Sequence, residues 1–144
     1  MYDRFNRKIE YVRISLTDRC NLRCRYCMPE EGVPKLAHDD ILRFDEIVRV
    51  VRQLAHLGIR KVRLTGGEPL VRRDITKLVA SIRAVSGIES IAVTTNGVLL
   101  PEMAKGLVQA GLSACNISLD TLRPGTFAAI TRRDAFSRVA AGIG

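Results

Sequence analysis

The stretch Lys61-Val62-Arg63-Leu64-Thr65, which runs straight into Gly66-Gly67-Glu68-Pro69, decides the fold of this chain. Its first five residues are typical of a buried strand, and the glycines and proline end that strand. Similar β-rich runs lie at residues 12–17, 90–95 and 114–119. Apolar residues spaced three and four apart predict helices between them, at 44–55, 75–85 and 103–108. This alternation predicts a parallel sheet covered by helices.

The number of these units indicates an α/β fold that is part of a TIM-type (βα) barrel. A closed eight-stranded barrel needs about 250 residues, whereas the 144 residues here hold the first four or so βα units. A further helix is expected at 134–143. The two outer strands would have unpaired edges, so we expect the rest of a barrel, or a partner, to matter for stability.

Polar residues follow the end of each expected strand. They are Thr17-Asp18, then Thr65 to Glu68, then Thr94-Thr95-Asn96-Gly97, then Ser118-Leu119-Asp120. In barrels and in open α/β sheets, the carboxyl ends of the strands carry the active site. The sequence therefore predicts that four separate loops converge on one site.

Three cysteines, Cys20, Cys24 and Cys27, follow the first strand in the pattern C-x3-C-x2-C. Thiols this close together favour metal or redox chemistry in a chain that is expected to be cytoplasmic. Structural zinc and iron–sulfur sites usually have four protein ligands, so three ligands leave one coordination position open. Zinc stays an alternative if Cys115 supplies a fourth thiolate, although a lone cysteine in an apolar strand is more often a small buried side chain.

The composition favours an anionic small molecule as partner. Lys and Arg number 23 against 15 Asp and Glu, a net charge of +8, and apolar residues make up 47% of the chain. With 5% aromatic residues and no Trp, the stacking groups of a single-strand nucleic-acid binder are few. No apolar run is long enough for a membrane span, and no secretory signal is visible at the start. We therefore expect a cytoplasmic protein with neither membrane nor nucleic acid as partner.

Two arginines, Arg13 and Arg63, interrupt apolar strands. Such charges cost free energy unless they are paired, meet an anion or alternate outward to solvent. The pairs Arg72-Arg73 and Arg132-Arg133 are interpreted as surface charges.

The loops after the second, third and fourth strands offer further candidate groups. Gly66 and Gly67 would let a ligand approach the backbone, and Glu68 would accept from a cationic amine. Thr94 and Ser118 offer hydroxyls. Each motif alone could be an ordinary turn, and Asp120 could cap the following helix.

Taken together, the cysteine motif and Gly66-Gly67-Glu68-Pro69 resemble the signature motifs of the radical S-adenosylmethionine enzymes. Within this family, the residues around these motifs are similar to the branch that cyclises GTP between C3' and C8, the first step of molybdenum cofactor biosynthesis. The resemblance covers nearly all 144 residues. It implies an enzyme of the lyase class that uses a [4Fe–4S] cluster, S-adenosylmethionine and an electron donor to generate a 5'-deoxyadenosyl radical.

The resemblance also implies roles for individual residues. The thiolates of Cys20, Cys24 and Cys27 would bind the cluster, and the fourth iron would bind S-adenosylmethionine. Further contacts to S-adenosylmethionine would come from Tyr26, Gly66, Gly67, Glu68 and Ser118. GTP would be bound by Arg13, Arg63 and Thr94. No side chain is expected to act as a catalytic acid or base.

The resemblance also marks a difference, because members of this branch are longer and bind a second [4Fe–4S] cluster through a C-terminal cysteine trio. That trio is absent from residues 1–144, which are expected to form the amino-terminal part of the barrel and to be inactive alone. A homodimer is possible. The alternatives are another radical S-adenosylmethionine enzyme, modifying a peptide or a tetrapyrrole, or a zinc-binding nucleic-acid module.

Overall fold

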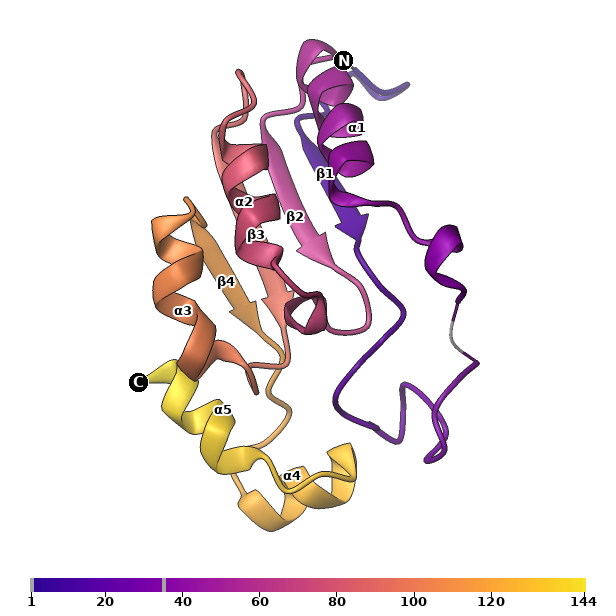
Figure 1. The fold of residues 1–144 in the computed structure, drawn as a ribbon, viewed down its shortest axis with the longest axis vertical. Helices are drawn as coiled ribbons and strands as arrows, with labels where there is room; N and C mark the ends of the chain where they lie inside the picture. The colour runs from indigo at the N-terminus through magenta and orange to yellow at the C-terminus, as the bar shows by residue number, and fades with distance from the viewer. Residues whose placement is uncertain (1, 35) are drawn as a thin grey trace.

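The computed structural model describes residues 2–34 and 36–144, which form one sheet and the helices that cover it (Figure 1). Within these residues the sheet has four parallel strands in the order β1-β2-β3-β4. The strands are β1 (Tyr11–Ser15), β2 (Lys61–Thr65), β3 (Ser90–Thr95) and β4 (Ala114–Ile117). The prediction of a parallel sheet built from four strands in chain order is thus confirmed.

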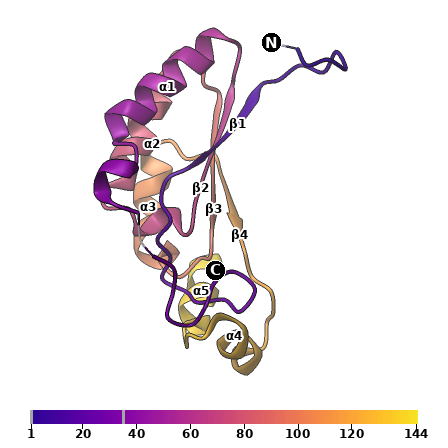
Figure 2. The ribbon, with the colours of Figure 1, turned by 90° about the vertical axis from the view of Figure 1, so that its right-hand side faces the viewer.

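Three helices follow the first three strands and lie against the same face of the sheet (Figure 2). They are α1 (Phe44–His56), α2 (Ile75–Arg83) and α3 (Leu100–Gln109). Two shorter helices, α4 (Pro124–Thr131) and α5 (Phe136–Ile143), lie below the carboxyl end of β4 (Figure 1). Short 3-10 turns span His38–Asp40 and Pro69–Val71.

The main apolar core lies between the sheet and α1 to α3. Alternate strand residues point into it, such as Val62 and Leu64 of β2 and Ile91 and Val93 of β3, which are at most 1% exposed. From the helix side, the core receives the apolar stripes that the three-and-four spacing predicts. Burying these two faces against each other stabilises the half-barrel.

The opposite face of the sheet carries the remaining residues of each strand, and no helix of the described chain covers it (Figure 2). Arg13 of β1 and Arg63 of β2 are direct neighbours in the strand register, so they lie on this inner face together. In a closed barrel this face would point toward the barrel axis. The side of the sheet that the cysteine loop borders is therefore cationic.

Three features differ from the sequence-based expectations. Helix α4 was not predicted, because it opens with Pro124-Gly125 and its apolar residues lack helical spacing. Cys115, expected to be buried, is exposed, since it lies on the edge strand β4. The first and last strands also end two residues earlier than expected.

Of the helices described, none has the length and apolar character to cross a membrane.

Candidate active site

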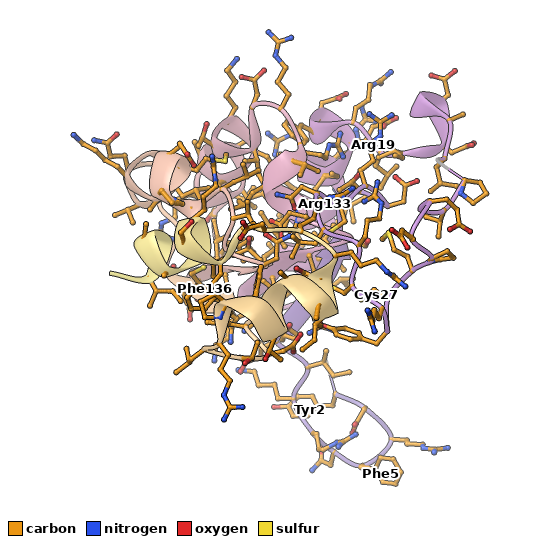
Figure 3. The ribbon with its side chains drawn as sticks, turned by 90° about the horizontal axis from the view of Figure 1, so that it is seen from below. Tyr2, Phe5, Arg19, Cys27, Arg133 and Phe136 are labelled. Atoms are coloured by element: carbon orange, nitrogen blue, oxygen red, sulfur yellow. The ribbon has the colours of Figure 1, made fainter. Side chains whose placement is uncertain are left out.

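The cysteine loop follows β1 and packs against α4 and α5. Leu22 is 4% exposed and packs in a second apolar cluster with Phe127 and Val139. The backbone adds two hydrogen bonds, from Arg23 N to Thr131 O at 2.9 Å and from Arg25 N to Ile130 O at 3.0 Å. Figure 3 views the strands from their carboxyl end, and Cys27 lies there beside α4. Segments more than 100 residues apart thus shape the loop.

Arg132 fastens this loop further. Its Nη1 donates to the carbonyls of Arg23 at 3.0 Å and Met28 at 3.2 Å, which flank the segment that carries Cys24 and Cys27. Arg132 itself has a left-handed backbone, with φ of 54°. The interpretation of Arg132 as a surface charge is therefore wrong. Arg72 is corrected in the same way, because it donates to the carbonyls of Leu16 and Leu42 and stacks on Phe44.

One cavity of about 230 Å³ gathers most of the residues that the sequence singled out. All three loop cysteines line it, together with residues from the ends of the strands. Those predicted to bind S-adenosylmethionine or GTP that line it are Tyr26, Gly66, Gly67, Glu68, Thr94 and Ser118. The convergence of four loops at one edge is confirmed, whereas the role of each residue stays a prediction.

The cysteine loop offers three thiols around one cavity, a donor set that fits an iron–sulfur cluster, whose usual protein ligands are thiolates. Cys20 and Cys24 are half-buried and Cys27 is exposed, and burial raises the pKa of the Cys20 and Cys24 thiols. Within the ranges described, no three His, Cys, Asp or Glu side chains are grouped so as to hold one ion. A cluster distributes its thiolates over several irons, so thiols spread around one cavity suit it. Cys115 does not line this cavity.

The paired glycines after β2 are required by the close passage of the cysteine loop. A Cβ on Gly66 would lie 2.5 Å from the carbonyl oxygen of Thr17, and one on Gly67 would lie 2.5 Å from that of Arg19. Gly66 also has φ of +143°, a backbone conformation that favours glycine. The amides of Gly67 and Glu68 donate to the same two carbonyls, at 2.7 and 2.8 Å. The motif therefore joins the β2 turn to the start of the cysteine loop.

Glu68 is a buried carboxylate, 1% exposed, whose two oxygens accept hydrogen bonds from this chain. Oε1 accepts from Leu70 N at 3.0 Å and Thr95 Oγ1 at 2.7 Å, and Oε2 accepts from Asn96 N at 2.7 Å. Burial raises the pKa of the Glu68 carboxyl, against the opposing effect of these donors. Glu68 thus ties the turn after β2 to the end of β3, in addition to the cofactor contact predicted for it.

Asn96 continues this connection to the cysteine loop. Its Nδ2 donates to Asn21 Oδ1 at 2.7 Å and lies 3.8 Å from the sulfur of Cys20. Its Oδ1 accepts from Val98 N at 3.1 Å. Asn96 belongs to a polar strand-end motif, but the sequence alone assigns it no role, because an Asn-Gly pair is indistinguishable from an ordinary turn without its partners.

Tyr26 and Asp120 meet across the cavity. The Tyr26 hydroxyl donates to Asp120 Oδ2 at 2.7 Å, which raises the pKa of the phenol. Asp120 does not cap α4, whose N-cap residue is Arg123. Ser118, two residues before Asp120, is exposed and donates its backbone N–H to Thr95 O at 2.8 Å.

The two strand arginines have different surroundings on the inner face. Arg63 Nη1 donates to Thr94 Oγ1 at 3.1 Å and to Asn116 Oδ1 at 2.5 Å. Arg13 is exposed, and neither guanidinium pairs with a carboxylate of residues 2–34 or 36–144. Two adjacent cations without a counter-ion favour an anionic ligand.

Comparison with known proteins agrees with this site. The model of the Radical SAM superfamily matches residues 14–144, and the chain belongs to this superfamily. Its cofactors are a [4Fe–4S] cluster and S-adenosylmethionine. Membership favours iron–sulfur chemistry over the zinc-binding alternative.

Curated relatives are similar over nearly the whole chain. The GTP 3',8-cyclase of Geobacter sulfurreducens is 54% identical over 143 residues, which are 99% of this chain and 44% of that protein. The GTP 3',8-cyclase of Pelotomaculum thermopropionicum is 58% identical over 132 residues, 92% of this chain and 41% of that protein. The chain therefore spans less than half the length of the curated relatives it matches.

Among solved structures, SuiB of Streptococcus suis has a similar fold. It superposes with a TM-score of 0.67 at 23% identity, covering 91% of this chain and 29% of SuiB. A second structure of SuiB, bound to the precursor peptide SuiA, gives the same TM-score at 22% identity. At this identity the likeness concerns the fold, and it confirms the predicted partial barrel.

Proposed function

We propose that this chain forms the cluster-binding half of a GTP 3',8-cyclase, which converts GTP into its 3',8-cyclised dihydro product in molybdenum cofactor biosynthesis. The geometric observation that carries the proposal is the placement of Arg13 beside Arg63 on the inner face, where Arg63 donates to Thr94, a residue that lines the cysteine cavity. The relatives named GTP 3',8-cyclase, more than half identical over almost the whole chain, support the same substrate.

In this proposal the residues divide into three groups. Cys20, Cys24 and Cys27 hold the cluster, which when bound supplies the electron that cleaves S-adenosylmethionine and yields a 5'-deoxyadenosyl radical. The cavity walls orient S-adenosylmethionine through Tyr26, Gly66, Gly67, Glu68 and Ser118. The inner face binds and orients the triphosphate and base of GTP through Arg13, Arg63 and Thr94, with Arg63 already fixed by Thr94 and Asn116.

The proposal includes what the site needs beyond these residues. Residues 1–144 act as the amino-terminal part of the barrel, while later strands and a second [4Fe–4S] cluster complete the guanine site. The isolated chain should therefore bind a cluster but turn over no GTP. An electron donor reduces the cluster, and the enzyme works in the cytoplasm, as a possible homodimer, without membrane or nucleic acid.

The test is anaerobic reconstitution of the chain with iron and sulfide, followed by absorption and electron paramagnetic resonance spectra with and without S-adenosylmethionine. We expect a brown protein whose resonance spectrum changes on addition of S-adenosylmethionine. A colourless protein holding zinc would overturn the proposal.

The substrate is tested separately, by titrating GTP into the complete enzyme and into its Arg13→Gln variant. Loss of the guanidinium should weaken GTP binding about tenfold, the scale of one charge-assisted contact. Equal affinity in both, or no GTP binding at all, would favour another radical S-adenosylmethionine reaction.

A further inference from the structure

We propose that Asn96 is a positioning residue that donates an N–H···S hydrogen bond to the Cys20 thiolate and thereby raises the reduction potential of the cluster. The inference rests on the proposed function, because it concerns the cluster that Cys20 would hold. It assigns a role to a residue outside the predicted ligand set. The reduction potential matters because the cluster must be reduced before it can donate an electron.

The orientation of the Asn96 side chain follows from its partners. Oδ1 accepts from Val98 N at 3.1 Å, which closes a turn directly after β3. The amide nitrogen must then point the other way, where Asn21 Oδ1 accepts one hydrogen at 2.7 Å and the Cys20 sulfur lies at 3.8 Å. Oδ1 of Asn96 cannot make either of these two contacts, because it already accepts from Val98 N.

The Asn96 backbone is fixed independently of its side chain. Its N–H donates to Oε2 of the buried Glu68 at 2.7 Å, and Oε1 of Glu68 accepts from Thr95. A rigid donor loses little conformational entropy on meeting its acceptor, so its position is preorganised. The hydrogen bonds of Asn96 to Glu68 and to Cys20 thus connect the glycine motif after β2 with the first cysteine of the loop.

The expected change in the reduction potential of the cluster has a definite sign. A hydrogen bond to a ligating sulfur stabilises the reduced state, which carries one more negative charge, and so raises the potential. Removing the donor should lower the equilibrium constant for reduction about tenfold, equivalent to roughly 59 mV for a one-electron couple.

The experiment measures midpoint potentials of the reconstituted chain by redox titration followed by electron paramagnetic resonance. Asn96→Ala removes the donor without adding charge and should lower the potential by that amount. Asn96→Asp keeps the oxygen that accepts from Val98 and should lower the potential further. Asn21→Ala is the matched control, because it removes the hydrogen bond between Asn96 and Asn21 but leaves the contact to sulfur. Its equilibrium constant for reduction should differ from that of wild type by no more than about twofold.

Each outcome decides the inference. An unchanged potential in Asn96→Ala, with a normal cluster, would overturn it and leave the proposed function intact. An equal drop in Asn21→Ala would overturn it too, because the effect would then come from loop placement. Failure of both Asn96 variants to assemble a cluster that Asn21→Ala assembles would overturn it as well, because Asn96 would then act in cluster assembly and not on the reduction potential. A wild-type chain without any iron–sulfur cluster would overturn both this inference and the proposed function.

Discussion

The hydroxyl of Tyr26 donates a 2.7 Å hydrogen bond to the carboxylate of Asp120, although 94 residues separate the two in the chain. Tyr26 belongs to the cysteine loop and Asp120 follows β4, the last strand described. Both line the cavity with the three cysteines. The pair therefore closes the site on the side where the edge strand ends.

The phenol of Tyr26 should titrate at higher pH than an ordinary tyrosine. Its pKa is raised because ionisation would lose the hydrogen bond and place a phenolate beside a carboxylate. Asp120→Asn should lower the pKa of Tyr26 back toward its ordinary value, which near-ultraviolet absorbance during an alkaline titration would detect. Asp18→Asn serves as the control. An unaltered titration curve in Asp120→Asn would rule out this contact in solution.

Replacing Gly67 by Ala should destabilise the chain, whereas the same change at Gly125 should not. The new Cβ at Gly67 would lie 2.5 Å from the carbonyl oxygen of Arg19, so the backbone must shift, at a cost of about 1–3 kcal/mol. At Gly125, in the first turn of α4, no atom lies within 4 Å, and alanine should stabilise the helix by up to about 1 kcal/mol. Urea unfolding of both variants measures the difference. Similar effects at the two sites would contradict the close packing.

Arg132→Ala should loosen the cysteine loop, because two carbonyls that flank Cys24 and Cys27 lose their donor. We expect the free energy of unfolding to fall by about 1–3 kcal/mol. A reconstituted cluster should also be lost faster to a chelator. Arg133→Ala is the control, since Arg133 is exposed and, among the residues that the structure describes, its guanidinium donates only to the carbonyl of Arg132. If both variants lost iron at the wild-type rate, the loop would not depend on Arg132.

Glu68→Gln should destabilise the fold even though the side chains of glutamate and glutamine have nearly the same shape. Both carboxylate oxygens accept from N–H or O–H donors, so the amide NH2 of glutamine must face one of them. An unsatisfied buried donor costs about 1–3 kcal/mol. Glu89→Gln, at an exposed position, should have almost no effect in the same urea experiment. Wild-type stability of Glu68→Gln would mean that the buried bonds contribute little.

The difference in free energy of unfolding between wild type and Glu68→Gln should depend on pH, and the sign of this dependence can be predicted. Burial raises the pKa of Glu68 in the folded chain above the ordinary 4.5. The stability associated with its protonated form is therefore fully present below pH 4.5 and is lost as pH rises through the folded-state pKa. The free energy of unfolding of wild type, minus that of Glu68→Gln, should fall over this pH range. A difference that rises with pH would show that the hydrogen bonds outweigh burial.

Local pattern was sufficient to predict the sheet. The helices after the first three strands follow from apolar spacing and from a glycine past each end, and the structure gives Gly58, Gly87 and Gly111 the left-handed φ of such ends. The strand-end motifs also predicted which loops meet, since parallel strands end at one edge. These features depend on neighbours in sequence.

What the sequence did not reveal depends on contacts between distant segments. The sequence does not distinguish Arg132 from its surface neighbour Arg133, because the carbonyls of Arg23 and Met28 that accept from Arg132 are distant in the chain. Asn96 resembles a turn residue until Cys20 lies beside it. Cys115 lies in an apolar run, yet its exposure is set by the position of β4 at the sheet edge. No spacing rule encodes such partners.

The main apolar core has a consequence for synthesis on the ribosome. Its buried members all lie between Leu16 and Leu107, and all come from the sheet, from α1 to α3 and from the turns between them. Because synthesis proceeds from the amino terminus, all of these buried side chains have left the exit tunnel before α4 and α5 emerge. The cysteine loop would then be anchored later, when α4 and α5 emerge and dock against Leu22.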